Sequence, residues 1–527
     1  MKRVLVSDSL AEEGLQIFRE AEGIEVDYRP GLSHEELLEC IGDYHGLAVR
    51  SGTKVGPDVF ERATKLQVVG RAGVGVDNID VEAASRHGVV VMNTPGGNSV
   101  TTAEHTLAMM MAVSRKIPQA TASLKAGRWE KSRFKGRELF RKTLGIIGLG
   151  NIGRIVADRA KGLKMEVLAY DPFLSEEAAR RLGVQLVDLP TLFRRSDYVT
   201  VHVPLTEETR GLIDAAAIDA MKKGVFIINC ARGGIVDEDA LHDALQSGKV
   251  AGAAFDVFVE EPPPADHPLL ALDNFICTPH LGASTTEAQV NVAVAVAEQM
   301  VAFLRSGEVR NALNLPTVSR ELLEALGPFI ELGRILGRIA GQLGPDHLDA
   351  LTIEVTGEVQ QHPVRPISVA ALVGVLAQQL DVPVNEVNAP HLARERGLSL
   401  VERSAAESEV FTSLVTVTAS SGDREFSVAG TIFGRAEPRI VRFEGFDLEA
   451  VPEGTILVIH NYDRPGVVGR IGSVLGAAGV NISRMQLSLD RPKGEALALV
   501  NVDSDDPEAI RQLSEIEHVI SVRVVKL

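Results

Sequence analysis

The N-terminal part of the chain alternates short apolar runs with amphipathic segments, and glycine, proline or small polar residues separate them. Runs that alternate between strand-like and helical periodicity indicate strands connected by helices. This order is typical of a small parallel sheet with helices on its faces. The pattern predicts strands over residues 4–7, 25–28, 46–50, 66–71 and 89–93, and helices over residues 10–20 and 33–41.

Two long helical segments, over residues 98–115 and 285–305, flank a second series of alternating strands and helices. The economical interpretation is an inserted α/β domain, with both long helices crossing between it and the first domain. The predicted first domain is therefore discontinuous, with residues 1–97 and 283–312, and the inserted domain comprises residues 98–282. A ligand-binding cleft is expected between these two domains.

The remainder of the chain has a different pattern. An apolar linker at residues 311–316 marks the boundary of a third domain, residues 313–452, which mixes helices with strands and is predicted to be α+β. The terminal domain, residues 453–527, follows the order βαββαβ, with strands over 455–460, 481–489, 495–503 and 519–526. That order is typical of a ferredoxin-like module.

Composition narrows the class of protein. The 527 residues are 45% hydrophobic and 24% charged, which is ordinary for a soluble protein, and the net charge of −17 disfavours a nucleic-acid or membrane partner. Three scattered cysteines, Cys40, Cys230 and Cys277, suit neither a disulfide framework nor a zinc site. No apolar run is long enough to span a bilayer, and the N-terminus has the pattern of a strand rather than a signal peptide. We expect a cytoplasmic protein without a metal site.

A glycine motif follows the first strand of the inserted domain. The apolar run 143–147 leads directly into Gly148-x-Gly150-x-x-Gly153. In a dinucleotide-binding turn the first glycine permits the tight turn, the second lets the backbone approach the pyrophosphate, and the third allows close helix packing. The helix that opens at Asn151 and Ile152 would direct free N–H groups at the phosphates.

Asp171 completes this fingerprint. It follows the next apolar run, 18 residues after Gly153. Its carboxylate can accept hydrogen bonds from the adenine-ribose hydroxyls and would repel a 2′-phosphate, so the sequence predicts NAD rather than NADP. The alternative is a plain βαβ turn, but two strands, the helix and the acid together favour cofactor binding.

Polar residues also follow three later apolar runs of the inserted domain. Arg232 and His280 are each predicted to end a strand, and Asp256 leads to Glu261. Because ligands of open α/β sheets bind beyond the carboxyl ends of the strands, these side chains can converge. Oxidation of an alcohol by a nicotinamide requires a base for the hydroxyl proton, and histidine titrates near neutral pH.

The other three residues fit the remaining tasks. Glu261 would orient the imidazole of His280, and the forked guanidinium of Arg232 can bind a substrate carboxylate. Asp256 would support the nicotinamide side of the pocket. The alternatives are a structural histidine at position 280, a surface arginine in a turn at position 232 and a solvated loop at Glu261-Pro262. The combination of these residues behind a nucleotide fingerprint favours catalytic roles.

Segments around these residues resemble a known family. Cys230–Asp237, Phe255–Phe258 with Glu261-Pro262, and Thr278–Gly282 are similar to the signatures of D-isomer-specific 2-hydroxyacid dehydrogenases. Residues 71–78 and 280–285, with the two C-terminal domains, resemble the long-form D-3-phosphoglycerate dehydrogenases of this family. The resemblance covers essentially the whole chain.

The resemblance implies a fold. It is a Rossmann-type doubly wound NAD-binding domain inserted in a smaller flavodoxin-like substrate-binding domain. An α+β intervening domain and a ferredoxin-like ACT domain follow.

The resemblance also implies site residues. Arg232, Glu261 and His280 are the catalytic residues. The NAD contacts implied are Gly148, Gly150, Asn151, Ile152, Gly153, Asp171, Cys230, Ala231, Arg232, Asp256, His280, Gly282 and Ala283. The substrate contacts implied are Arg50, Ser51, Gly73, Val74, Gly75 and Asn98.

The activity implied is NAD-dependent oxidation of 3-phosphoglycerate to 3-phosphohydroxypyruvate, the first step of L-serine biosynthesis, by a homo-oligomer, expected to be a tetramer. Two alternatives remain open. One is another D-2-hydroxyacid dehydrogenase that reduces glyoxylate, hydroxypyruvate or 2-oxoglutarate. The other is an NAD-sensing protein without turnover, which the presence of all three catalytic residue types disfavours.

The terminal domain resembles an ACT domain, a fold that senses amino acids. The resemblance implies that Asn461, Asp463 and Asn481 contact an effector, expected to be L-serine. Some relatives carry His or Tyr at the position of Asn461, and a dimerisation unit without ligand is the alternative. The third domain resembles the intervening domain of long-form relatives, which implies that it binds a phosphorylated anion between subunits. Arg396, Arg439 and Arg442 are candidate donors by charge alone, and a structural spacer is the alternative.

One basic segment stands out in this acidic chain. Residues 128–135 carry two arginines and two lysines beside Trp129. The segment either extends into a neighbouring subunit's cleft and helps to bind phosphate, or forms a solvated loop with Trp129 at a dimer interface.

Overall fold

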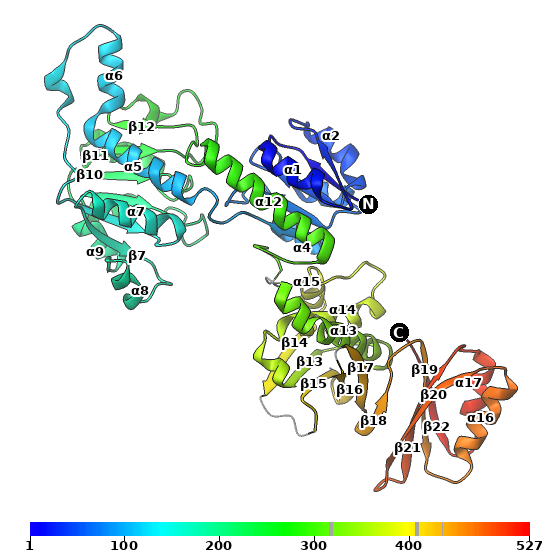
Figure 1. Ribbon diagram of the computed structural model, residues 1–527. Coiled ribbons are helices and arrows are strands. Elements are labelled where there is room, and N and C mark those ends of the chain that lie inside the picture. Colours follow the sequence, from blue (N-terminus) through cyan, green and yellow to red (C-terminus); the bar gives the residue numbers. More distant parts are fainter. Residues whose placement is uncertain (316–319, 406–409, 435) are drawn as a thin grey trace.

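The computed structural model describes residues 1–315, 320–405, 410–434 and 436–527 (Figure 1). Four sheets follow one another along the chain, and each predicted domain contains one of them. Pro316, the last residue of the predicted linker, and residues 317–319, 406–409 and 435 of the predicted third domain lie outside the described residues. The exact domain bounds stay predictions.

The first domain is built on a five-stranded parallel sheet in the order β2-β1-β3-β4-β5, which is the flavodoxin-like order. Its strands are β1 (Lys2–Val6), β2 (Ile24–Tyr28), β3 (Gly46–Val49), β4 (Val68–Arg71) and β5 (Val90–Met92). Its helices are α1 (Glu12–Glu20), α2 (His34–Cys40), α3 (Pro57–Arg62) and α4 (Val81–Arg86). Helices α3 and α4, which the apolar pattern did not predict, each have six residues, too few to show helical periodicity.

The inserted domain contains a seven-stranded parallel sheet in the order β12-β11-β10-β9-β6-β7-β8. Its strands are β6 (Thr143–Ile147), β7 (Glu166–Tyr170), β8 (Gln185–Leu186), β9 (Tyr198–Val201), β10 (Val225–Asn229), β11 (Val250–Phe255) and β12 (Phe275–Cys277). The chain order reverses beside β6, so the Rossmann-type switch point lies where the glycine motif follows this strand.

Two helices connect these domains, as the sequence predicts (Figure 1). The chain enters the inserted domain through α5 (Ser99–Arg115) and returns through α12 (Thr286–Ser306). Helix α5 packs against α7 (Asn151–Gly162) of the inserted domain, whereas α12 packs against α1 of the first domain. The crossing helices therefore place the carboxyl ends of the two sheets on opposite sides of one cleft.

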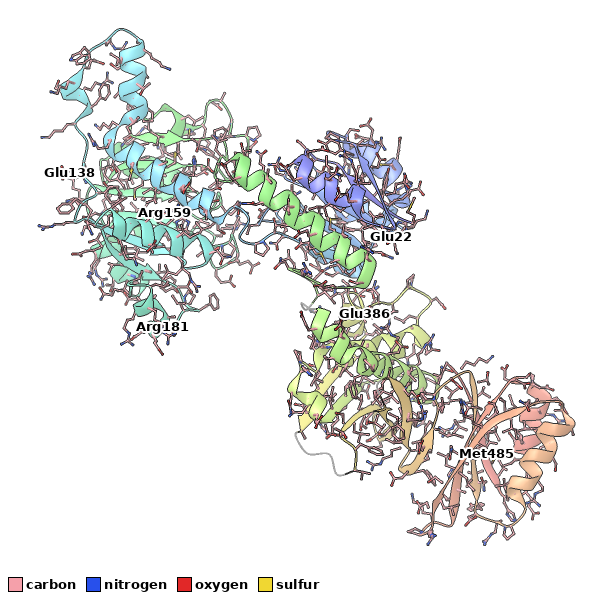
Figure 2. All side chains as sticks on the ribbon, in the orientation of Figure 1. Glu22, Glu138, Arg159, Arg181, Glu386 and Met485 are labelled. Carbon is pink, nitrogen blue, oxygen red and sulfur yellow. The ribbon has the colours of Figure 1, made fainter. Side chains whose placement is uncertain are left out.

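The third domain packs α13 (Arg320–Leu343) and α14 (Arg365–Gln379) against a six-stranded mixed sheet in the order β14-β13-β15-β16-β17-β18. Its strands are β13 (Ala350–Gly357), β14 (Ser399–Ala405), β15 (Ser413–Ser421), β16 (Arg424–Phe433), β17 (Glu437–Phe443) and β18 (Phe446–Ala450). Arg334 of α13 pairs with Glu386 at 2.9 Å. Glu386, labelled in Figure 2, follows Asn385, whose side-chain amide donates to the carbonyl of Gly88 in the first domain.

The terminal domain has the predicted βαββαβ order and an antiparallel sheet, β20-β21-β19-β22. The elements are β19 (Thr455–Tyr462), α16 (Val467–Ala477), β20 (Ile482–Asp490), β21 (Glu495–Val502), α17 (Pro507–Ser514) and β22 (Val519–Lys526). One sheet face packs on α16 and α17, and Ile456, Val458 and Leu499 of the other face join the core of the third domain. In the described part of the chain, no helix is both long and apolar enough to cross a membrane.

Two strands of the inserted domain end earlier than predicted. Strand β10 ends at Asn229 and β12 at Cys277, so Arg232 and His280 both lie on loops. The side chain of Asn229 causes the first turn, because its Oδ1 accepts from the Ala231 N–H and its Nδ2 donates to the Arg232 carbonyl. The site residues therefore stand beyond the strand ends rather than on them.

Candidate active site

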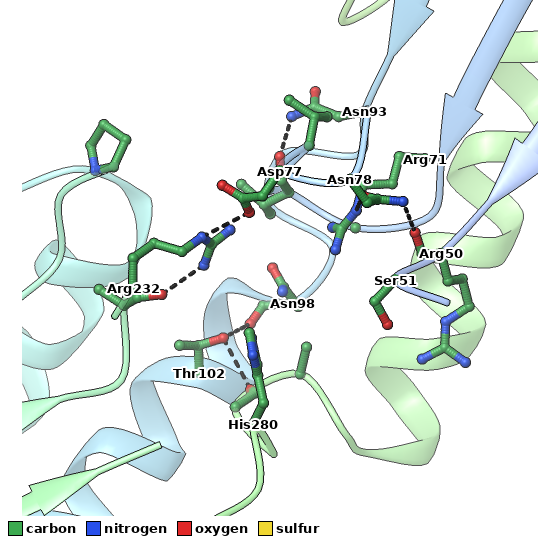
Figure 3. Close-up of a pocket in the computed structure, with 18 of the residues that line it drawn as sticks. Arg50, Ser51, Arg71, Asp77, Asn78, Asn93, Asn98, Thr102, Arg232 and His280 are labelled. Carbon is green, nitrogen blue, oxygen red and sulfur yellow. Dashed lines mark hydrogen bonds and ion pairs between the residues drawn. The ribbon is translucent and has the colours of Figure 1, made fainter. Parts of the chain in front are cut away.

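A cleft of about 1450 Å³ lies between the first and inserted domains (Figure 3). Its two walls bring together residues that are far apart in the sequence. Predicted substrate contacts in its lining are Arg50, Ser51, Gly73, Val74, Gly75 and Asn98. Predicted catalytic and cofactor residues in its lining are Asn151, Ile152, Cys230, Ala231, Arg232, Asp256, Glu261, His280, Gly282 and Ala283.

The glycine loop lies beside this cleft rather than in its lining. Gly148 has a φ of 93°, and a side chain there would meet the carbonyl oxygen of His202 at 2.6 Å. Gly150 caps α7, and a side chain at this position would meet no described atom within 4 Å, so the space above the loop is open. Open space at a helix N-terminus fits the pyrophosphate of a dinucleotide.

Asp171 stands at the carboxyl end of β7, where the sequence places it. Its Oδ2 accepts from the Leu149 N–H at 2.8 Å and its Oδ1 from the Phe173 N–H at 2.9 Å. Each carboxylate oxygen has a second lone pair for a ribose hydroxyl. The residues at this end of the sheet therefore fit an adenosine that carries no 2′-phosphate.

His280 and Glu261 form a close pair on the inserted-domain wall. His280 Nδ1 lies 2.7 Å from Glu261 Oε2. Because an ionised carboxylate only accepts hydrogen bonds, Nδ1 carries a proton and Nε2 is the basic atom of the neutral ring. The hydrogen bond to Glu261 raises the pKa of His280 above its ordinary value, although burial opposes this. The side chain of His280 is 48% exposed, so its ring remains open to the cleft.

The same pair affects the acid. Burial alone would raise the pKa of Glu261, but the hydrogen bonds from His280 and from the Phe258 N–H lower it below its ordinary value. Glu261 is therefore ionised at neutral pH and stabilises a proton on His280. This arrangement suits a general base that holds the proton taken from a hydroxyl.

Asp256 supports the loop that carries His280. Its carboxylate accepts from the Thr278 hydroxyl at 2.5 Å and from the Leu281 and Gly282 N–H groups, each at 2.7 Å. Burial would raise the pKa of Asp256, but His105 and the other donors lower it. Asp256 is buried. His280, next to this network, has a φ of 54°, a backbone conformation that residues other than glycine rarely adopt.

One cleft residue, Arg71, and one neighbour of the cleft residue Asp256, His105, are not predicted as site residues by the sequence. Burial lowers the pKa of Arg71 to about 10, and the charge of Arg232 acts in the same direction. The Nε of Arg71 donates to Asn78 Oδ1 at 3.2 Å. His105 on α5 lies 3.2 Å from the Asp256 carboxylate. Arg71 begins the motif of residues 71–78, whereas His105 has no local signature.

Two polar atoms of the lining are buried without a partner. Asn98 Oδ1 and His202 Nδ1 make no hydrogen bond within the described residues. Burial lowers the pKa of His202 to about 4, so its ring is neutral at physiological pH. Buried polar atoms are normally paired, so these two atoms fit a cleft that receives a polar ligand.

The residues expected to contact an effector are divided between buried and exposed positions. Asn461 is buried, and its Nδ2 donates to the Tyr462 carbonyl while its Oδ1 has no partner in the described chain. Asp463 and Asn481 are exposed. No hydrogen bond joins the side chains of these three described residues.

The arginines considered in the third domain have partners of their own. Arg439 pairs with Glu437 at 2.7 Å, and Arg442 pairs with Asp447 at 2.9 Å. Arg396 donates to the Leu392 carbonyl. These contacts favour the structural alternative for the three residues.

The basic segment follows α6 (Ile117–Lys125) and includes a short 3-10 helix over Lys131–Phe134. In Figure 1 this region extends beyond the parallel sheet of the inserted domain. Trp129 is 82% exposed, and Arg133 pairs with Asp273 at 3.1 Å. Within one chain, the segment does not line the cleft.

Comparisons with known proteins identify the family. Residues 107–282 match the model of the NAD-binding domain of D-isomer-specific 2-hydroxyacid dehydrogenases, 325–444 the D-3-phosphoglycerate dehydrogenase intervening domain, and 455–518 the ACT domain. The D-3-phosphoglycerate dehydrogenase of Methanocaldococcus jannaschii is 45% identical, with all of both chains covered. The chain belongs to the D-3-phosphoglycerate dehydrogenase family. The Bacillus subtilis enzyme of this name is 40% identical over the full length of both chains.

Solved structures match about three fifths of the chain of this family member. A formate dehydrogenase of Staphylococcus aureus in complex with NAD has a TM-score of 0.54 and 29% identity, covering 60% of this chain and 100% of that chain. The D-lactate dehydrogenase of Escherichia coli has a TM-score of 0.53 and 30% identity, covering 59% of this chain and 100% of that chain. The expected fold is confirmed, and the chain is an NAD-dependent oxidoreductase.

Proposed function

We propose that this enzyme oxidises D-3-phosphoglycerate to 3-phosphohydroxypyruvate, the first step of L-serine biosynthesis. The observation that carries the proposal is the placement of the His280–Glu261 pair and Arg232 in one cleft with Arg50 and Arg71. Relatives that bear the name D-3-phosphoglycerate dehydrogenase cover the full length of the chain and support the choice of substrate.

The chemistry follows from the orientation of the residues. Bound NAD supplies the hydride acceptor, and the glycine loop, the N-terminus of α7 and Asp171 would hold it. His280 removes the proton of the substrate hydroxyl through Nε2, and Glu261 stabilises the resulting imidazolium. Arg232 binds the substrate carboxylate and polarises the carbonyl that forms.

The opposite wall suits a phosphate. Arg50 and Lys54 line the cleft together with the half-buried Arg71. A pKa of about 10 leaves Arg71 protonated at neutral pH. Charge-assisted hydrogen bonds from these groups would hold a dianionic phosphate at the end of the substrate opposite the carboxylate.

Regulation and assembly are also part of the proposal. The ACT domain would bind L-serine, with Asp463 and Asn481 as exposed contacts for the amino acid. The exposed Trp129 and its basic segment support association of subunits, and a tetramer is the proposed assembly. We place the enzyme in the cytoplasm.

The direct test incubates purified protein with NAD and D-3-phosphoglycerate at alkaline pH, with hydrazine to trap the product. The proposal expects NADH to appear and L-serine to inhibit its appearance. Glyoxylate, hydroxypyruvate and 2-oxoglutarate are then offered with NADH in parallel. Reduction of one of these acids without any turnover of 3-phosphoglycerate would contradict the proposed substrate.

A further inference from the structure

Arg232 and Asp77 meet across the cleft, one from each domain (Figure 3). Arg232 Nε donates to Asp77 Oδ2 at 3.0 Å, and Arg232 Nη1 donates to the carbonyl oxygen of Ala231 at 2.6 Å. In the part of the chain that the structure describes, Nη2 makes no hydrogen bond. Two contacts therefore fix the plane of the guanidinium, and Nη2 is a donor nitrogen without a hydrogen-bond partner in the described residues.

The loop of the first domain leaves space for this contact. A side chain at Gly75 would overlap Nη2 of Arg232 and would lie 2.8 Å from Asp77 Oδ2. Because glycine has no Cβ, the guanidinium packs directly on the backbone of this loop. Gly75 and Asp77 together form the surface that Arg232 contacts.

The ion pair contributes little to folding stability. The side chain of Asp77 is 67% exposed and that of Arg232 is 29% exposed. Solvent screens such a pair, and the entropy lost on ordering the two side chains offsets much of the attraction. The geometry that the pair imposes is therefore its main physical consequence.

We propose that Asp77 is a positioning residue that orients Arg232 for the substrate carboxylate. This inference rests on the proposed function, in which Arg232 binds that carboxylate. Asp77 occupies Nε, so the substrate binds through the Nη side of the fork. Because the partners lie on opposite walls, the orientation of Arg232 also depends on the separation of the two domains.

An alternative role would have the opposite consequence. If Asp77 only competed with the substrate for Arg232, its removal would free the guanidinium and lower the KM. If it positions Arg232, its removal lets the guanidinium rotate, and the KM rises. The sign of the change therefore distinguishes the two roles.

The experiment compares Asp77→Ala, Asp77→Asn and the wild type in steady-state oxidation of 3-phosphoglycerate. Loss of a hydrogen bond to a charged group predicts a KM about tenfold higher for Asp77→Ala. The rise is smaller for Asp77→Asn, because an amide oxygen still accepts from Nε. The NAD dissociation constant and the melting temperature stay at wild-type values. Glu61→Ala, which removes an exposed acid of the same domain, controls for net charge.

A double variant tests whether Asp77 acts through Arg232. In an Arg232→Gln background, Asp77→Ala is expected to cause no further loss of kcat/KM, because the group that it orients is absent. Losses that multiply in the double variant, or a KM that is unchanged or lower in Asp77→Ala, would overturn the inference. A wild-type enzyme that does not oxidise 3-phosphoglycerate would reject the proposed substrate instead, and the same comparison is then made with the acid that is turned over.

Discussion

The imidazole of His280 and the carboxylate of Glu261 are held 2.7 Å apart in the lining of the cleft, although the two residues are 19 positions apart in the sequence. The pair leaves His280 Nε2 as the atom that can accept a proton from a substrate. Glu261 is itself held by the Phe258 N–H, so the position of the acid does not depend on His280 alone.

The pair predicts a pH dependence. Oxidation requires neutral His280, and Glu261 raises the pKa of His280, so the rate of oxidation increases as pH rises through this raised pKa. In Glu261→Gln the pKa of His280 falls, and the midpoint of the kcat/KM profile moves to lower pH. Turnover also falls, by on the order of 10-fold to 100-fold, because the ring loses its orientation. The exposed neighbour variant Glu260→Gln should retain the wild-type profile, and an unshifted midpoint in Glu261→Gln would contradict the pairing.

The carboxylate of Asp171 is expected to select NAD over NADP. Removing its carboxylate in Asp171→Ala eliminates the repulsion of a 2′-phosphate and the acceptors for the ribose hydroxyls. We expect the ratio of kcat/KM for NAD to that for NADP to fall about tenfold or more. Glu166→Ala removes an exposed acid from the other end of the same strand and should leave the ratio unchanged. An unaltered ratio in Asp171→Ala would show that another residue selects the cofactor.

Asp256 predicts a coupled loss of stability and activity. In Asp256→Ala the Thr278 hydroxyl and the Leu281 and Gly282 N–H groups lose their acceptor, at a cost of roughly 1–3 kcal/mol for each buried donor left unpaired. The free energy of unfolding, measured with denaturant, should therefore decrease. Turnover should also fall, because the His280 loop is no longer held. Asp256→Asn retains one acceptor oxygen and should lie between the two proteins. Wild-type stability in Asp256→Ala would contradict this account of the network.

The ACT domain predicts a separable regulatory effect. Asp463 is exposed on the terminal domain, where its carboxylate can pair with the amino group of an effector. Asp463→Ala should raise the serine concentration for half-inhibition about tenfold or more, with uninhibited kcat unchanged. Glu517→Ala, with a side chain that is 78% exposed in the same domain, is the matched control. Equal sensitivity of all three proteins to serine would exclude Asp463 from the effector site.

The order of elements was largely predictable from the sequence, because alternating periodicity and glycine punctuation are local signals. Strands β1 to β5 and the βαββαβ order of the terminal domain follow from these signals. The six-residue helix α3 and the two-residue strand β8 do not, since each is too short to show a period. The early end of β10 depends on side-chain hydrogen bonds of Asn229, which the apolar pattern does not record.

The site was predictable to a similar extent. His280, Glu261 and Arg232 lie in recognisable motifs, and the structure brings them into one cleft. The contact of Arg232 with Asp77 joins residues 155 positions apart and has no local signature. The burial of Asn461 likewise depends on the tertiary packing of the terminal domain.

The most direct test of the account measures turnover and cofactor affinity in His280→Ala. Loss of the general base predicts a kcat lower by about 10²- to 10⁴-fold, whereas the NAD dissociation constant, measured by calorimetric titration, stays close to the wild-type value. Near-wild-type turnover, or an equal loss of turnover and NAD affinity, would contradict the assignment of His280 as the base.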